Sequence, residues 1–239
     1  MQMANGRQVV HDRLGSFGDY AASDAITQTT VDDVTPAVFI VDDDISVRES
    51  LESLIRTAGW EAESFASAEE FLAYPRGPVA CCVVVDVTLP GLSGLDLQKR
   101  FAGRLDTPMI FISGHTDIPQ TVQAMKGGAF EFLTKPLRTE LLLKAIHSAI
   151  DRSRDTLRLD AEVRALRDRF ESLTPREAEV MTLVVSGLLN KQVGGELGIS
   201  EVTVKAHRGQ VMRKMLAGSL AALVMMATRL GVRHSFVDC

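Results

Sequence analysis

Short apolar runs alternate with amphipathic stretches through the middle of the chain. Five runs rich in apolar residues predict β-strands at 37–41, 60–65, 81–85, 109–112 and 131–134. Five amphipathic stretches predict helices that begin near Val47, Ser67, Ser93, Pro119 and Thr139. Strands that alternate with helices indicate parallel βαβ units, and continuously apolar strands are typical of a sheet covered on both faces. We therefore expect an α/β doubly wound domain with a five-stranded parallel sheet.

The last of these helices continues well past the predicted sheet. Apolar positions recur every three or four residues, but the middle of the stripe is polar, at Arg152 and Thr156. We predict one long or broken helix over 139–170. Residues 139–150 are expected to be the last helix of the α/β domain, and residues 151–169 a linker helix. A coiled-coil dimer along the stripe is an alternative that the spacing leaves open.

Four short helices are predicted after the long one, each bounded by capping residues. The boundary residues are Thr174 and Gly187 for the first, Asn190 and Gly198 for the second, Ser200 and Met215 for the third, and Ser219 and Gly231 for the fourth. The tight link at 197–200 is typical of a helix-turn-helix motif. Residues 170–232 are therefore expected to form an all-α four-helix domain.

Composition agrees with a two-domain globular protein. The chain has 239 residues, of which 46% are hydrophobic and 24% charged. Residues 1–36 are polar and lack sustained periodicity, which predicts a mobile tail, and residues 233–239 are predicted to be a second tail. No apolar run approaches the roughly 18 residues of a membrane span, and the polar start lacks the apolar centre of a signal peptide. We expect a cytoplasmic protein that makes no use of a membrane.

The three cysteines indicate neither a disulfide framework nor a zinc site. Two are adjacent, Cys81 and Cys82, and the third is Cys239. We expect Cys81 and Cys82 to be buried strand residues.

Charge is unevenly distributed along the chain. Residues 36–137 carry 14 acidic and 8 basic side chains, whereas residues 171–239 carry 6 acidic and 8 basic ones. The contrast is sharpest within 191–215, where five basic residues outnumber Glu196 and Glu201. A basic helix on a small domain suggests nucleic-acid binding, and a solvated helix face is the simpler alternative.

Polar side chains follow four of the five predicted strands. These are Asp42, Asp43 and Asp44 after the first strand, Asp86 after the third, Ser113 after the fourth and Lys135 after the fifth. The carboxyl ends of parallel strands share one edge, where ligands bind in doubly wound folds. Converging carboxylates suit Mg²⁺, and a lysine and a hydroxyl beside them suit phosphoryl transfer, with Asp86 as the nucleophile. Each residue taken alone is more often a turn residue or a helix cap, and it is the combination of all of them that favours the site.

The motifs at these strand ends resemble the receiver domain of bacterial two-component response regulators. They are ValAspAspAsp at 41–44, the segment 86–94, SerGlyHis at 113–115 and LysPro at 135–136, and the resemblance covers about 37–150. It implies that Asp86 accepts a phosphoryl group from a sensor histidine kinase. It also implies a cis peptide before Pro136 and a homodimer, formed on phosphorylation, through residues 119–146.

The receiver resemblance also implies roles for the other site residues. Asp43, Asp86 and the Thr88 backbone carbonyl would hold Mg²⁺, with Asp42 assisting through a water molecule. Ser113 and Lys135 would contact the phosphoryl oxygens, and Ser113 and Phe132 would change position on activation. In receiver domains threonine is commoner than serine at the position of Ser113, and the position of Thr88 is variable. The only catalysis implied is Mg²⁺-dependent self-phosphorylation and slow self-dephosphorylation.

The C-terminal part resembles the LuxR-type helix-turn-helix output domain, and HisArgGly at 207–209 resembles the FixJ-like subgroup. The motifs lie at 173–180, 190–193, 197–200 and 203–208, and the resemblance covers about 170–232. It implies that the third short helix enters the major groove of double-stranded DNA. The residues expected nearest the bases are Lys205, Ala206, Arg208 and Gly209, and the expected phosphate or groove-edge contacts are Lys191, Gln192, Thr203 and His207.

Other residues of this domain are expected to serve its packing. We predict that the core contains Val202, Val204, Val211 and Met215. Gly194 and Gly195 depart from the alanine-rich pattern of the family, which predicts a loosened second helix.

Together these observations predict a phosphorylation-gated transcriptional regulator. Two alternatives remain at this point: a constitutive DNA-binding module with a silent receiver, and a phospho-aspartyl hydrolase. The hydrolase chemistry calls for a second acid two residues after the nucleophile, where this chain has Thr88.

Overall fold

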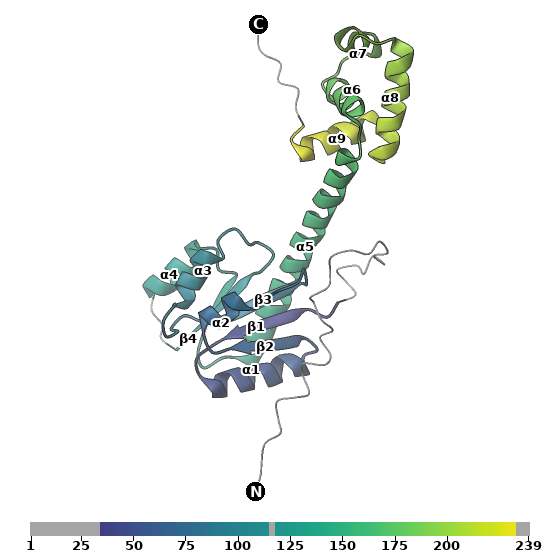
Figure 1. Ribbon diagram of the computed structural model, residues 1–239. Coiled ribbons are helices and arrows are strands. Elements are labelled where there is room, and N and C mark those ends of the chain that lie inside the picture. Colours follow the sequence, from purple (N-terminus) through teal and green to yellow (C-terminus); the bar gives the residue numbers. More distant parts are fainter. Residues whose placement is uncertain (1–33, 115–117, 233–239) are drawn as a thin grey trace.

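The computed structural model describes residues 34–114 and 118–232, and both predicted tails lie largely or wholly outside this range. Figure 1 shows a sheet flanked by helices at one end of a long helix and a bundle of short helices at its other end. The expected two-part organisation is therefore confirmed.

The sheet has five parallel strands in the order β2-β1-β3-β4-β5. The strands are β1 Ala37–Val41, β2 Glu61–Phe65, β3 Cys81–Asp86, β4 Met109–Ser113 and β5 Glu131–Thr134. All of β3 and β4 is buried, whereas the edge strands β2 and β5 are partly exposed. Burial of central strands on both faces explains why their sequences are continuously apolar.

Helices cover both faces of the sheet. Alternate strand residues point to opposite faces, so Val38 and Ile40 pack with α1 and α5, while Phe39 and Val41 pack with α2, α3 and α4. The bounds of the shorter helices are α1 Ile45–Thr57, α2 Ala68–Ala73, α3 Gly94–Arg100 and α4 Ile118–Lys126. Cys81 and Cys82 are buried in β3, as predicted.

The long helix α5, Thr139–Glu171, is continuous. Its packing against the α/β domain extends into the predicted linker. The buried Ser153 hydroxyl accepts a hydrogen bond from the Cys81 backbone nitrogen (3.0 Å) and donates one to the Asp106 carbonyl, and Leu157 is buried in the same core as Ile150.

The apolar stripe of α5 serves the two domains separately. Leu142 and Ala149 pack under the sheet, and Leu166 packs in the C-terminal bundle. Between them Leu159 is 57% exposed. A coiled coil along the whole stripe would need residues that this fold already buries within one chain.

Four short helices follow α5. They are α6 Pro175–Val185, α7 Asn190–Leu197, α8 Glu201–Lys214 and α9 Leu220–Leu230. Thr174 and Glu177 form the predicted capping box, and Ser200 and Ser219 cap α8 and α9 through their side chains. Gly198 ends α7 with a φ of 64°. The expected four-helix domain is confirmed.

One expectation about α7 was wrong. Asn190 is not the N-cap: Leu189 occupies that position, and the Asn190 side chain accepts a hydrogen bond from Arg208 (3.1 Å). The loosening of α7 expected from Gly194 and Gly195 stays a prediction, but Gly194 has a packing role. A β-carbon there would lie 2.7 Å from the Ile199 carbonyl oxygen, so the glycine allows α7 to pack closely against the turn before α8.

No described helix is both long and apolar enough to cross a lipid bilayer. The cytoplasmic location therefore stays a prediction.

Candidate functional site

Three of the predicted side chains meet at the carboxyl edge of the sheet. The Lys135 ammonium group donates to an oxygen of Asp42 (2.9 Å) and to an oxygen of Asp86 (2.6 Å). Both aspartates are buried, whereas Lys135 is half-buried. β1, β3 and the end of β5 thus bring two carboxylates from distant parts of the sequence to one cation.

Backbone groups fix the two carboxylates. The Asp42 carboxylate accepts from the Asp44 backbone nitrogen (2.9 Å), and the Asp86 carboxylate accepts from the Thr88 backbone nitrogen (2.8 Å). The Arg48 side chain donates to the Asp42 carbonyl (2.7 Å), which ties α1 to the end of β1. The nucleophile candidate therefore sits in a preorganised frame.

The charge in this site is unbalanced. Burial raises the pKa of the Asp42 carboxyl above its ordinary value, and the hydrogen bond from Lys135 offsets this only in part. Burial lowers the pKa of Lys135, but the hydrogen bonds to Asp86 and Asp42 outweigh it, so this pKa lies above its ordinary value. One ammonium group serves two buried carboxylates, with Asp43 exposed beside them. An additional cation would relieve this excess of negative charge.

The donor set fits Mg²⁺. The carboxylates of Asp43 and Asp86 and the Thr88 carbonyl are oxygen ligands of the kind that this ion binds, together with water. Among the described residues, no three His, Cys, Asp or Glu side chains converge as a metal site. In the predicted set only Asp43 and Asp86 would bind the ion directly through carboxylates, since Thr88 would use its backbone carbonyl and Asp42 a water molecule, so the set does not require such a convergence.

Ser113 and Phe132 lie on the neighbouring strands. Ser113 is buried at the end of β4, and its carbonyl accepts from the Lys135 backbone nitrogen (2.8 Å). Phe132 is half-buried on β5 and stacks on Phe111 with ring centroids 6.4 Å apart. The peptide bond between Lys135 and Pro136 is cis, as the resemblance implied. His115 lies outside the described residues.

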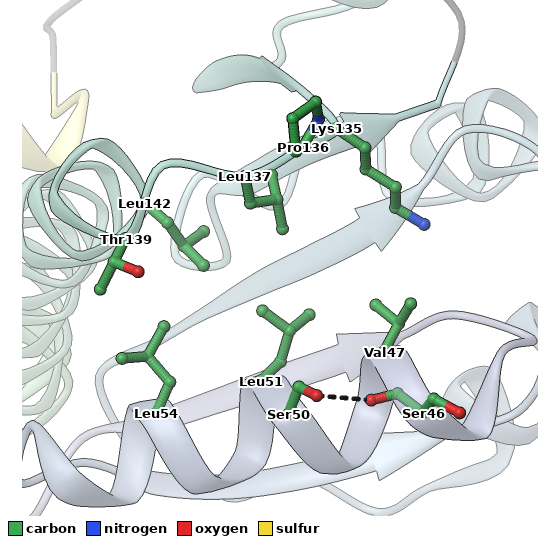
Figure 2. A pocket seen from close by; sticks show the side chains of 10 residues that line it. All are labelled: Ser46, Val47, Ser50, Leu51, Leu54, Lys135, Pro136, Leu137, Thr139 and Leu142. Atoms are coloured by element: carbon green, nitrogen blue, oxygen red, sulfur yellow. Dashed lines mark hydrogen bonds between the residues drawn. The ribbon is translucent and has the colours of Figure 1, made fainter.

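A hollow of about 560 Å³ opens beside this site, between α1 and the loop from β5 to α5. Figure 2 shows Leu51, Leu54 and Val47 of α1 facing Leu137 across it, with Lys135 at one side. Asp42 and Asp86 do not line this hollow. It is a mainly apolar surface next to the acidic site and is separate from it.

The second set of predicted residues lies on the helix-turn-helix unit. Lys205, Ala206 and Gly209 are exposed on α8, and Figure 1 shows α8 at the far end of α5 from the sheet. The remaining predicted contacts are exposed Lys191, Gln192 and Thr203 and half-buried His207 and Arg208. Described parts of the sheet domain therefore leave this face of α8 uncovered.

Comparison with known families covers both parts of the chain. Residues 38–147 match the response regulator receiver domain, and residues 171–227 match the bacterial regulatory proteins of the luxR family. The chain is a two-component response regulator. It belongs to the group in which a receiver is joined to a LuxR-type DNA-binding domain, and it regulates transcription under the control of phosphorylation.

Several relatives of this response regulator align over most of its length. Nodulation protein W of Bradyrhizobium diazoefficiens is 52% identical over 202 residues, which cover 84% of this chain and 89% of that protein. The transcriptional regulatory protein FixJ of the same organism is 39% identical, covering 82% of this chain and 96% of that protein. The solved structure of the response regulator StyR is 45% identical, covers 82% of this chain and 100% of that chain, and has a TM-score of 0.74.

The structure also shows what the sequence analysis missed in this response regulator. Val202 was expected in the core and is 76% exposed, because it lies two residues from buried Val204 and so points to the other side of α8. Two predicted DNA contacts hold partners within the chain: Gln192 accepts from the Leu189 backbone nitrogen (2.8 Å), and Arg208 donates to Asn190. The helical period of 3.6 residues was enough to predict from the sequence that Val202 and Val204 lie on different sides of the helix.

Proposed function

We propose that Asp86 accepts a phosphoryl group from a sensor histidine kinase and that this switches DNA binding by the output domain. The observation that carries the proposal is the Lys135 ammonium group held between Asp42 and Asp86 at the edge of the sheet. An Asp86 oxygen attacks phosphorus, the bond from phosphorus to the donor nitrogen breaks, and the donor imidazole leaves with its electron pair. Lys135 stabilises the negative charge of the transferring group.

Mg²⁺ would be held by residues around Asp86. We assign its ligands to Asp43, Asp86 and the Thr88 carbonyl, with Asp42 acting through water. The bound ion supplies charge neutralisation for the transferring phosphoryl group. The same arrangement supports self-phosphorylation from a small phosphodonor and slow self-dephosphorylation as the chain's own chemistry.

The switch then runs through the neighbouring strands. Phosphorylation replaces the single negative charge of the Asp86 carboxylate with a phosphoryl group that carries about 1.5 to 2 negative charges, which draws the Ser113 hydroxyl and Lys135 towards the phosphoryl oxygens. Phe132, packed against Phe111 at the edge of the sheet, changes rotamer with this movement. A population shift between two receiver states is sufficient for such a switch.

Dimerisation connects the switch to DNA. Within 119–146, Val122 and Met125 of α4 and Leu141 of α5 are exposed, at 45%, 46% and 44%. These exposed apolar side chains support the proposed homodimer of phosphorylated receivers. Two joined α8 helices on a symmetric site gain affinity from their raised effective concentration.

The proposal is tested by incubating the full chain with Mg²⁺ and acetyl phosphate, followed by intact mass and size-exclusion chromatography. We expect a mass gain of one phosphoryl group and a shift to the dimer in the wild type, and neither change in Asp86→Asn. Binding to promoter-derived duplexes should rise in the wild type alone.

Two results would contradict the proposal. A wild-type chain that binds DNA equally with and without phosphodonor would be a constitutive module with a silent receiver. Release of free phosphate over many turnovers would indicate a phospho-aspartyl hydrolase.

A further inference from the structure

The outward face of α8 carries one large apolar side chain. Val202 is 76% exposed, while Val204 and Val211, on the opposite side of the helix, are completely buried. With 3.6 residues per turn, Val202 shares its side of the helix with Ala206 and Gly209. Val202 therefore lies at the N-terminal end of the face that carries the predicted base contacts Ala206 and Gly209.

The rest of this face is small and basic. Ala206 and Gly209 present little or no side chain, and a β-carbon built on Gly209 would meet nothing within 4 Å. The fold of the domain therefore does not require a glycine there. Lys205 also lies on this side and pairs with Glu201 (3.4 Å). A cation beside small residues suits close approach to DNA, with Val202 projecting from the first turn of the helix.

We infer that Val202 determines sequence specificity by contacting the C5-methyl group of a thymine in the major groove. This inference rests on the proposed DNA binding by α8. Residues in the first turns of the recognition helix contact base edges in helix-turn-helix proteins. The thymine methyl is the one apolar group that a base edge presents in the major groove, and apolar side chains recognise it by contact. Val202 has no polar atom to read any other feature of a base edge.

The test uses DNA that the protein itself selects. The full-length wild-type chain, incubated with Mg²⁺ and acetyl phosphate, enriches binding sites from a pool of randomised duplexes. Each thymine of the selected site is then replaced singly by deoxyuridine, which removes only the methyl group. Affinities are measured by fluorescence anisotropy at one fixed salt concentration, because phosphate contacts make them salt-dependent.

We expect one thymine in each half-site at which uracil weakens wild-type binding about fourfold, the equivalent of burying one methylene-sized apolar group. Val202→Ala should bind the thymine and uracil duplexes equally. Val224→Ala is the matched control: it removes the same atoms from a partly exposed valine on α9 and should keep the fourfold difference whatever its overall affinity. Circular dichroism checks that both variants retain the helical content of the wild type.

Three results would overturn the inference. The first is that the wild-type chain binds the thymine and uracil duplexes with equal affinity at every position, or that the selected site contains no thymine. The second is a methyl dependence of equal size in the wild type and in Val202→Ala. The third is failure to enrich any duplex, which would contradict the proposed DNA binding itself, whereas the first two leave that binding intact.

Discussion

Two lysine–carboxylate clusters of similar geometry lie in the two domains. In the receiver, Lys135 donates to Asp42 (2.9 Å) and Asp86 (2.6 Å), and in the output domain Lys214 donates to Glu177 (2.7 Å). The two lysine side chains are equally accessible, at 26% and 28% exposed. Their surroundings differ. In the receiver one ammonium group pairs with two buried carboxylates, whereas in the output domain one ammonium group pairs with one carboxylate.

This difference in charge balance distinguishes the proposed phosphorylation site from a structural ion pair. Burial raises the pKa of Asp42, so its ionised form destabilises the receiver. The hydrogen bond from Lys214, with that from the Thr174 backbone nitrogen, lowers the pKa of Glu177, so its ionised form stabilises the output domain. Excess negative charge favours the binding of a further cation at the receiver site, while the balanced pair joins α6 to the end of α8.

Exchanging the two lysines for neutral residues gives the largest expected contrast. Lys135→Gln removes the cation that, in the proposed mechanism, stabilises the transferring phosphoryl group, and we expect uptake of the phosphoryl group from acetyl phosphate to slow about 100-fold. Lys214→Gln should leave this rate unchanged and weaken the output domain by about 1 kcal/mol. Time-resolved intact mass measures the rate, and hydrogen exchange of α6 and α8 measures the stability.

The comparison fails if both variants slow phosphorylation equally. Such a result would mean that general destabilisation, rather than local charge, controls the receiver. Lys126→Gln, at the exposed end of α4, controls for the loss of a positive charge in the same domain.

Neutralising Asp42 should stabilise the receiver. At pH 7 the side chain is ionised in the folded and unfolded states, and its raised pKa means that ionisation costs more in the folded state. Asp42→Asn removes this cost and keeps an oxygen to accept from the Asp44 nitrogen. We expect a higher unfolding temperature, by roughly 4 to 8 °C for each 1 kcal/mol gained, measured by calorimetry in EDTA. An unchanged or lower unfolding temperature would contradict the charge imbalance.

The stabilisation should also depend on pH. The wild-type receiver should gain stability as the pH falls towards the pKa of Asp42, because protonation relieves the same cost. In Asp42→Asn this gain should be absent, so the difference between the two proteins narrows at acid pH.

The ends of the strands were predictable because each central strand is a continuous apolar run that stops abruptly at a polar residue. Continuous apolar runs identified β1, β3 and β4, and the parallel arrangement then placed Asp42, Asp86 and Lys135 at one edge without further information. The charge imbalance was not predictable, because it depends on how deeply each carboxylate is buried.

The output domain shows where residue type misleads. Val202 was assigned to the core because valine is apolar, although its position relative to Val204 places it on the outer face of α8. Asn190 has the chemistry of an N-cap but pairs with Arg208, a contact between helices that no local pattern reveals. The close approach of Gly194 to Ile199 is likewise a tertiary contact.

The smallest expected effect is the pH dependence of the balanced pair. The pKa of Glu177 is lower in the folded state than in the unfolded chain, so its stabilisation is complete above about pH 4.5, the ordinary value, and is lost as the pH falls through the folded value. Glu177→Gln should therefore cost about 0.5 to 1 kcal/mol at pH 7 and less at pH 3. Hydrogen exchange of α6 and α8 at the two pH values measures both differences.

Glu179→Gln provides the control for this last comparison. Glu179 lies on the same helix, but its ion pair with Arg176 is exposed, so its loss should be nearly neutral at both pH values. A cost in Glu177→Gln that is the same at pH 3 as at pH 7 would show that Glu177 acts through packing. In that case charge balance would no longer explain why neutralising Asp42 is expected to stabilise the protein and neutralising Glu177 to destabilise it.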